Sequence, residues 1–183
     1  MQRCPQTDTQ SVYQHGVSVR DHLLQLIHYL DSGEISGEWK LPDWIKHYQL
    51  QIKSALLPKE VIEEYAVFHD CGKPYCLTLD EQGKRHFPNH TQVSAQTWVR
   101  ADGNQQIAKL IEMDMTIHTI KAEGLDDFIK HPEAITLLLA GLAEVHSNAK
   151  MFGGIESESF KIKWSQINRR GKAICQKLFG DMS

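Results

Sequence analysis

Apolar residues recur at helical spacing along most of the chain. Between residues 12 and 30 they fall three, four or seven positions apart on one helical face, until the polar run DSGEISG ends the pattern. Similar patterns predict further helices at 42–55, 58–70, 90–101, 104–122, 125–130, 132–149 and 157–179. The segment 76–87 alternates weakly around Glu-Gln-Gly and predicts a small β-hairpin. We therefore expect an all-α fold with one small hairpin.

Length and composition indicate one ordinary globular domain. A chain of 183 residues, 41% of them hydrophobic, can bury a substantial core, so we expect residues 1–183 to form a single domain. No stretch approaches the roughly 18 consecutive apolar residues of a membrane span. The four cysteines form no C-x-x-C pair, which favours reduced thiols and a cytoplasmic protein. A net charge of −3 gives no sign of a general nucleic-acid binder.

The densest group of chemically useful residues is VFHDCGKPYCLTLDEQGKRHFPNH, at residues 67–90. An apolar helix leads directly into His69 and Asp70, which together can bind one divalent cation through an imidazole nitrogen and a carboxylate oxygen. Lys73 follows within a few residues and can meet an anion held by the same cation. Ten histidines in the chain fit such a site. A metal, a lysine and further histidines point to phosphate-ester chemistry.

The motif HDCGKP at 69–74, followed by HFPNHTQVSA at 86–95, resembles the HD superfamily of metal-dependent phosphohydrolases. It is most similar to the HD domains of bacterial CCA-adding tRNA nucleotidyltransferases and to the HD modules fused to polynucleotide kinases in RNA repair. The resemblance is dense over residues 13–100 and becomes thin after residue 122. It implies an HD-type helical bundle and a hydrolytic enzyme.

The resemblance also implies metal ligands, one position at a time. His15, in YQHGVSV, matches the histidine of the family's first helix. His69 and Asp70 are the doublet itself. His90 opens the helix after the hairpin, in the place of the family histidine that precedes x-x-x-S-A.

Two further ligands are expected later in the chain. His118 falls on the helical face of Ile111 and Met115 and is expected to point inward, although by itself it would be read as an interior histidine. The family's last ligand is an aspartate on a late helix. Here LAEVHSNA places Glu144 at that position, with His146 as the alternative.

This ligand set allows one or two divalent metal ions. Histidines at both the His90 and His118 positions resemble the set that supports two. Mixed imidazole and carboxylate ligands suit Mn, Fe, Co, Ni or Zn better than Mg. The expected reaction is attack of a metal-activated water on phosphorus with departure of an alcohol.

Asp70 and Lys73 are the expected catalytic residues. Asp70 would bind metal and take a proton from the water, and Lys73 would neutralise the phosphoryl oxygens. Arg20 and Lys121, each placed one turn past a proposed ligand, are further candidates for contacts with substrate phosphate. His22 is a candidate to line the same cleft. Each of these three also has an ordinary interpretation as a solvated side chain.

The C-terminal segment offers the main sequence evidence about the substrate. Two aromatics, Phe160 and Trp164, are interleaved with basic residues: Lys161, Lys163, Arg169, Arg170, Lys172 and Lys177. Such a pattern can bind a phosphate backbone and stack on bases, or it can be an amphipathic closing helix whose aromatics pack on the core. With the resemblance, it favours a nucleotide or an RNA 2′/3′-end phosphate as substrate. The alternatives are a (deoxy)nucleotide 5′-phosphatase or triphosphohydrolase, and an inactive HD-fold binding module.

Overall fold

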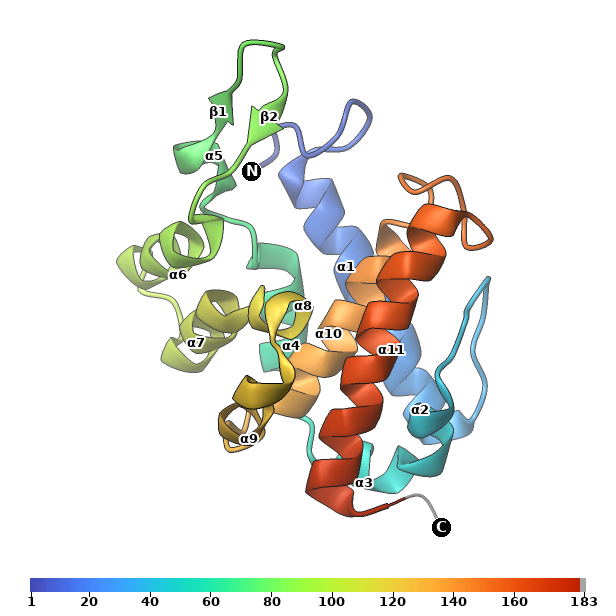
Figure 1. Ribbon diagram of the computed structural model, residues 1–183. Helices are drawn as coiled ribbons and strands as arrows, with labels where there is room; N and C mark the ends of the chain where they lie inside the picture. Colours follow the sequence, from blue (N-terminus) through green and yellow to red (C-terminus); the bar gives the residue numbers. More distant parts are fainter. Residues whose placement is uncertain (182–183) are drawn as a thin grey trace. The chain divides into compact units, whose positions relative to one another are not determined.

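The computed structural model describes residues 1–181 and is mostly helical, with one small two-stranded sheet (Figure 1). This confirms the all-α prediction and the hairpin. The chain divides into two compact units. The first unit combines Met1–Arg20 with Lys59–Met115, and the second combines Asp21–Pro58 with the residues from Thr116 on. The expectation of a single domain stays a prediction.

The first unit contains the HDCGKP motif. It begins with the N-terminal part of α1 (Val12–Ser32) and continues with α4 (Lys59–Phe68), α5 (Lys73–Cys76), β1 (Thr78–Leu79), β2 (Arg85–His86), α6 (His90–Arg100) and α7 (Gln105–Met113). The strands pair antiparallel, with Thr78 opposite His86 and Leu79 opposite Arg85. Helix α7 packs on α4 and α6. Its apolar face buries Ile107, Leu110 and Ile111 in the core of this unit.

The second unit is built around two long helices, of which the first is buried. It comprises the rest of α1, α2 (Asp43–His47), α3 (Gln49–Ser54), α8 (Thr116–Thr119), the 3₁₀ helix η1 (Ala122–Gly124), α9 (Leu125–Phe128), α10 (Ala134–Ser147) and α11 (Glu158–Phe179). Helix α10 packs on α11 and is buried along most of its length, in keeping with its nearly continuous apolar sequence. A side chain at Gly171 would meet the ring of Trp44 at 2.4 Å, so glycine lets α11 approach that ring closely.

Two predicted helices are each divided in the structure. The helix expected at 42–55 is split at Tyr48, a buried residue whose hydroxyl donates to the carbonyl of Gly180. The helix expected at 104–122 ends at Met113, and the buried Asp114 that follows accepts a hydrogen bond from the hydroxyl of Tyr65. The single helix predicted at 104–122 was therefore wrong. So was the helical phase that placed Met115, which is 36% exposed, on an inward face.

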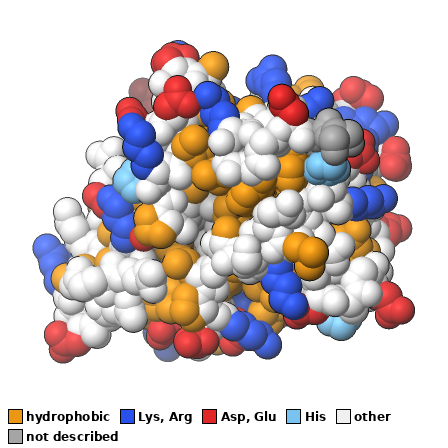
Figure 2. Space-filling view, turned by 90° about the horizontal axis from the view of Figure 1, so that it is seen from below, with side chains coloured by type: hydrophobic (Ala, Val, Ile, Leu, Met, Phe, Trp, Pro, Cys, Tyr) orange, Lys and Arg blue, Asp and Glu red, His pale blue; other side chains and the backbone are white. Residues whose placement is uncertain are grey.

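The surface agrees with the small net charge. On the face shown in Figure 2, basic and acidic side chains are interspersed, with hydrophobic side chains between them. Among the described residues, no helix is both long and apolar enough to cross a bilayer.

Candidate metal centre

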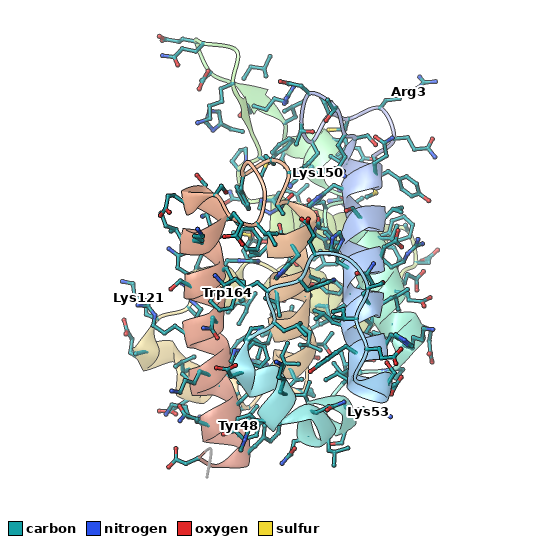
Figure 3. All side chains as sticks on the ribbon, turned by 90° about the vertical axis from the view of Figure 1, so that its right-hand side faces the viewer. Arg3, Tyr48, Lys53, Lys121, Lys150 and Trp164 are labelled. Atoms are coloured by element: carbon teal, nitrogen blue, oxygen red, sulfur yellow. The ribbon has the colours of Figure 1, made fainter. Side chains whose placement is uncertain are left out.

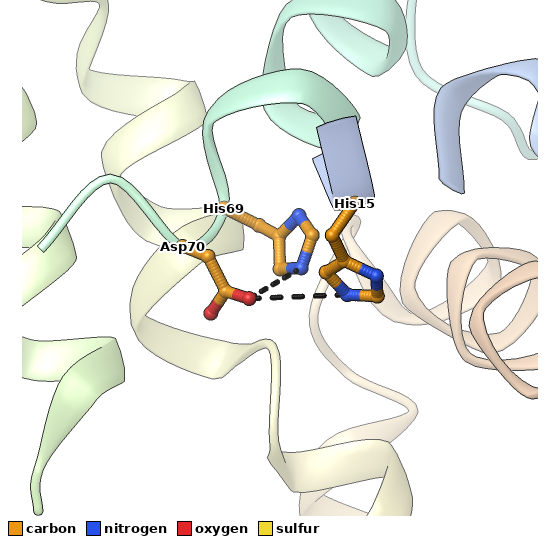
Figure 4. Close-up of side chains that lie close together, drawn as sticks. All are labelled: His15, His69 and Asp70. Atoms are coloured by element: carbon orange, nitrogen blue, oxygen red, sulfur yellow. Dashed lines mark ion pairs between the residues drawn. The ribbon is translucent and has the colours of Figure 1, made fainter. Parts of the chain in front are cut away.

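His15, His69 and Asp70 meet in the interior of the first unit (Figure 4). His15 lies in the first turn of α1, and the doublet follows the end of α4. The two helices come together at Gly16, where an added Cβ would lie only 2.1 Å from the carbonyl oxygen of Val67. The absence of a side chain at this position lets the backbones touch. That contact places His15 directly against the His-Asp doublet.

The three side chains have the geometry of a metal-binding group. Nε2 of His15 and Nε2 of His69 lie 3.9 and 3.3 Å from Oδ2 of Asp70. Two donors that each bind one ion at about 2.1 Å can be at most about 4.2 Å apart, so both distances are compatible with a shared ion. The three residues are 0, 3 and 2% exposed. A buried group of this kind can hold a divalent metal ion.

The orientation of His69 is fixed by the backbone. Its Nδ1–H donates to the carbonyl oxygen of Ala66 at 2.8 Å, so Nε2 is the ring nitrogen that faces Asp70. Metal-ligating histidines are held in this way by a hydrogen bond from the other ring nitrogen. The hydrogen bond therefore fixes which ring nitrogen of His69 is directed at Asp70 and at a metal bound there.

His90 stands at the edge of the same group. Its Nδ1 donates to the carbonyl of Phe87 at 3.2 Å, and its Nε2 lies 3.8 Å from Oδ1 of Asp70. Its side chain is 22% exposed, so it lies closer to solvent than His15 or His69. The two oxygens of Asp70 thus face different histidines.

Lys73 is part of the cluster and is not a solvated turn lysine. It is 8% exposed, its Nζ lies 2.6 Å from Oδ2 of Asp70, and it also donates to Oε1 of Gln6 at 3.0 Å. The ring of Phe87 lies 5.1 Å away. Burial raises the pKa of the Asp70 carboxyl, but the charges of His69 and Lys73 outweigh it and hold that pKa well below its ordinary range. Asp70 is therefore ionised at neutral pH.

The last two predicted ligands meet in the second unit. Nε2 of His118 and Oε2 of Glu144 are 2.8 Å apart, and both side chains are 23% exposed. The alternative ligand, His146, is fully engaged elsewhere: its Nδ1 donates to the carbonyl of Leu142 at 2.9 Å, and its Nε2 accepts from the amide of Lys40 at 3.2 Å. The geometry therefore favours Glu144 over His146 as the partner of His118.

The predicted substrate contacts are less organised. Arg20 is half-buried near the end of the part of α1 that belongs to the first unit. The ring of His22 lies 5.7 Å from the ring of Trp39 in the second unit. Lys121 is exposed and lies beyond the end of α8 in extended backbone, so the expectation that it follows His118 by one helical turn was wrong.

The basic C-terminal segment matches the amphipathic alternative. Phe160 is fully buried, and Nε1 of Trp164 (labelled in Figure 3) donates to the carbonyl of Lys40, whose own Nζ lies 4.5 Å above the Trp164 ring. Phe160 is therefore not available to stack on a base, and Trp164 is engaged by Lys40. Lys161 pairs with Glu156 at 3.4 Å. Lys163, Arg169 and Lys172 are exposed on α11.

Sequence reasoning missed several contacts that shape the two regions. Gln6 on Lys73, Phe87 beside Lys73, and the Trp39–Lys40 pair around His146 all come from segments without a regular pattern. No local signal in the sequence indicates them.

Comparison of the chain with protein-family models, with curated proteins and with solved structures gave no match.

Proposed function

We propose that this chain is a metal-dependent phosphohydrolase of the HD type, cytoplasmic, which acts on a nucleotide or on the 2′/3′-end phosphate of an RNA. The observation that carries the proposal is the environment of Asp70. One buried carboxylate is shared among the imidazoles of His15, His69 and His90 and the ammonium of Lys73.

The residues fit a transition-metal ion in both number and chemistry. His15, His69 and Asp70 would hold it, and the mixed nitrogen and oxygen donors suit Mn, Fe, Co, Ni or Zn. A bound ion would supply Lewis acidity and lower the pKa of a coordinated water. His118 and Glu144 are proposed as ligands in their own unit, where an imidazole and a carboxylate already lie 2.8 Å apart.

Asp70 and Lys73 would carry the chemistry of the protein itself. Asp70 is ionised, and a carboxylate in this position can accept a proton from the attacking water. As the water oxygen bonds to phosphorus, the bond to the ester oxygen breaks, and that oxygen takes the proton back from Asp70 and leaves as an alcohol. The ammonium of Lys73, which lies 2.6 Å from Asp70, would neutralise the phosphoryl oxygens during this exchange.

The buried charges favour an enzyme over a binding module. Taking ionised groups out of water carries a desolvation penalty, and apolar residues would serve a purely structural core as well. A (deoxy)nucleotide phosphatase or triphosphohydrolase uses the same metal chemistry and is the main alternative. The burial of Phe160 and the contacts of Trp164 with Lys40 weaken base stacking on α11 as an argument for RNA.

Metal content and hydrolysis, measured together, test the proposal. The wild-type protein and two variants, His69→Ala and His86→Ala, would be loaded with Mn, Co, Ni or Zn and analysed for bound metal. They would then be assayed on RNA oligonucleotides ending in 2′-, 3′- or cyclic phosphate and on mononucleotides. His86 is an exposed histidine of the same unit, bonded to Asp80 on the hairpin, and serves as the matched control.

We expect His69→Ala to lose metal and activity and His86→Ala to keep both. A wild-type protein that binds no metal and hydrolyses none of these esters contradicts the proposal. So does equal loss in the two variants.

A further inference from the structure

The N-terminal segment folds into a loop beside the hairpin (Figure 1). Pro5 and Ser11 form an isolated antiparallel bridge, and the amides of Gln6 and Thr7 both donate to the carbonyl of Gln10. Two side chains of this loop reach cations of the first unit. Oε1 of Gln6 accepts from Nζ of Lys73 at 3.0 Å, and Oδ1 of Asp8 accepts from Nη2 of Arg85 at 2.7 Å.

Arg85 and Lys73 are connected through Phe87. Arg85 lies on β2, and Phe87 follows it by two residues. Alternate residues of an extended segment point to the same side, so Arg85 shares a side of the hairpin with Phe87. The Phe87 ring in turn lies 5.1 Å from Nζ of Lys73. Arg85 and Lys73 are also joined through the N-terminal loop, which reaches Arg85 with Asp8 and Lys73 with Gln6.

The loop gives a scale for the separation of the two cations. Gln6 and Asp8 are two residues apart in a bent loop, so their Cα atoms are at most about 7 Å apart. Acceptors at this spacing occupy both cations at once. Two phosphates on different carbons of one nucleoside are anions at a comparable spacing.

We propose that Lys73 and Arg85 form a two-point anion site, in which Arg85 binds a second phosphate of the substrate. The inference rests on the proposed function, since it takes the phosphate beside Lys73 as the one that is hydrolysed. Gln6 and Asp8 occupy the two points until a substrate displaces them. The substrate class is a nucleoside or oligonucleotide end with a second phosphate about one nucleoside away.

The exposure of the loop makes this displacement feasible. The Asp8 side chain is 93% exposed, and that of Arg85 is 30% exposed. An ion pair this open to water contributes little, because solvent and salt screen it. A phosphate carries more charge than a carboxylate and accepts two parallel hydrogen bonds from a guanidinium. Arg85 should therefore bind a phosphate in preference to the carboxylate of Asp8.

Calorimetric titration of the metal-free protein tests the site without hydrolysis. The probes are adenosine 3′-monophosphate and adenosine 3′,5′-bisphosphate, and the proteins are the wild type, Arg85→Ala and Lys84→Ala. Lys84 is an exposed cation next to Arg85 and controls for the loss of one positive charge. We expect the wild type and Lys84→Ala to bind the bisphosphate about tenfold more tightly than the monophosphate. Arg85→Ala should bind both alike.

Asp8→Asn isolates the role of the loop. It should tighten binding of the bisphosphate a few-fold in the wild-type background and have no effect when combined with Arg85→Ala, since the two residues act through one contact. Equal affinity of the wild type for both probes, absence of binding, or equal losses in Arg85→Ala and Lys84→Ala would overturn the inference.

Hydrolysis of the same two compounds by the Mn-loaded proteins separates this inference from the proposed function. Selective binding without turnover would leave the anion site standing and remove the phosphohydrolase. Turnover that Arg85→Ala lowers by the same factor for both compounds would leave the phosphohydrolase standing and remove the role of Arg85.

Discussion

Two buried histidines, one in each unit, make the same kind of hydrogen bond to a backbone carbonyl of the preceding turn but have different surroundings. The Nδ1–H of His69 donates to the carbonyl of Ala66, and that of His146 donates to the carbonyl of Leu142. The second ring nitrogen differs. Nε2 of His69 faces the carboxylate of Asp70 at 3.3 Å, whereas Nε2 of His146 accepts the backbone amide of Lys40 at 3.2 Å.

The difference shows that the partner of the second nitrogen determines what a buried histidine can do. Around His146 the partners are neutral: the Trp39 ring stacks on it at 4.2 Å, and the Phe160 ring meets its edge at 5.2 Å. Burial lowers the pKa of His146 to about 4, so it stays neutral and holds the Lys40 segment in place. Around His69 the neighbours are charged groups. The first arrangement stabilises the fold, and the second is suited to binding a cation.

The largest effect should come from Asp70→Asn, which keeps the shape of the side chain and removes its charge. We expect loss of bound metal and a fall in kcat on the order of 1000-fold, because both the metal ligand and the proton acceptor are lost. Metal analysis and steady-state kinetics would measure this. His146→Gln, the matched change in the other histidine environment, should retain the metal. Metal loss in both variants would erase the distinction between the two sites.

Gly16→Ala should show whether the close contact between α1 and α4 is what positions His15. Its Cβ would lie 2.1 Å from the carbonyl oxygen of Val67, a backbone atom, so α1 must move away from α4. We expect a loss of about 3 kcal/mol in the free energy of unfolding and weaker metal binding, because His15 moves with the helix. Gly124→Ala is the control, since its Cβ would meet only the flexible side chain of Ile120 at 3.3 Å. Urea denaturation of both variants measures the difference, and equal stabilities would contradict this account of Gly16.

The pH dependence of stability should distinguish His146 directly. Its folded pKa of about 4 is below the ordinary value of 6.5, so between these values the unfolded chain binds the proton more readily. The associated stability is fully present above pH 6.5 and is lost as the pH falls toward 4, by about 3 kcal/mol. Denaturation curves at several pH values would show this slope. In His146→Gln the slope over this interval should be smaller, and an unchanged slope would count against a neutral, buried His146.

The smallest expected effect on unfolding free energy concerns two lysines that lie over aromatic rings. Nζ of Lys40 lies 4.5 Å from the Trp164 ring, and Nζ of Lys73 lies 5.1 Å from the Phe87 ring. Lys40→Met should cost about 0.5–1 kcal/mol in unfolding free energy and leave turnover unchanged. Lys73→Met should lower kcat more than it changes stability, because its ammonium acts on phosphate charge. Thermal melts and steady-state kinetics on both variants would distinguish the two roles. Equal losses of kcat in the two variants would contradict this prediction.

Much of the fold could be predicted from the sequence because helical periodicity is a local property. The helices at both ends of the chain and the hairpin at 76–87 follow directly from it. The breaks at Tyr48 and Asp114 could not be predicted, since they depend on hydrogen bonds to Gly180 and Tyr65, which are distant in sequence.

Part of the candidate site could also be predicted from the sequence, and part could not. The HDCGKP motif indicated His69, Asp70 and Lys73, and the first-helix pattern indicated His15, which the structure places beside them. The burial of Lys73 against Asp70 had no sequence signal, because lysine in a turn is ordinarily solvated. The pairing of His118 with Glu144, and of His146 with the amide of Lys40, also had no signal in the sequence.

The ion pair between Lys73 and Asp70 also determines how the charge of the buried carboxylate is balanced. Small zinc-binding domains stay unfolded until the metal neutralises their ligands. Here the chain supplies its own cation at 2.6 Å from the buried carboxylate, so the negative charge is balanced within the polypeptide. The charge of Asp70 therefore does not require a bound metal ion to balance it in the folded chain.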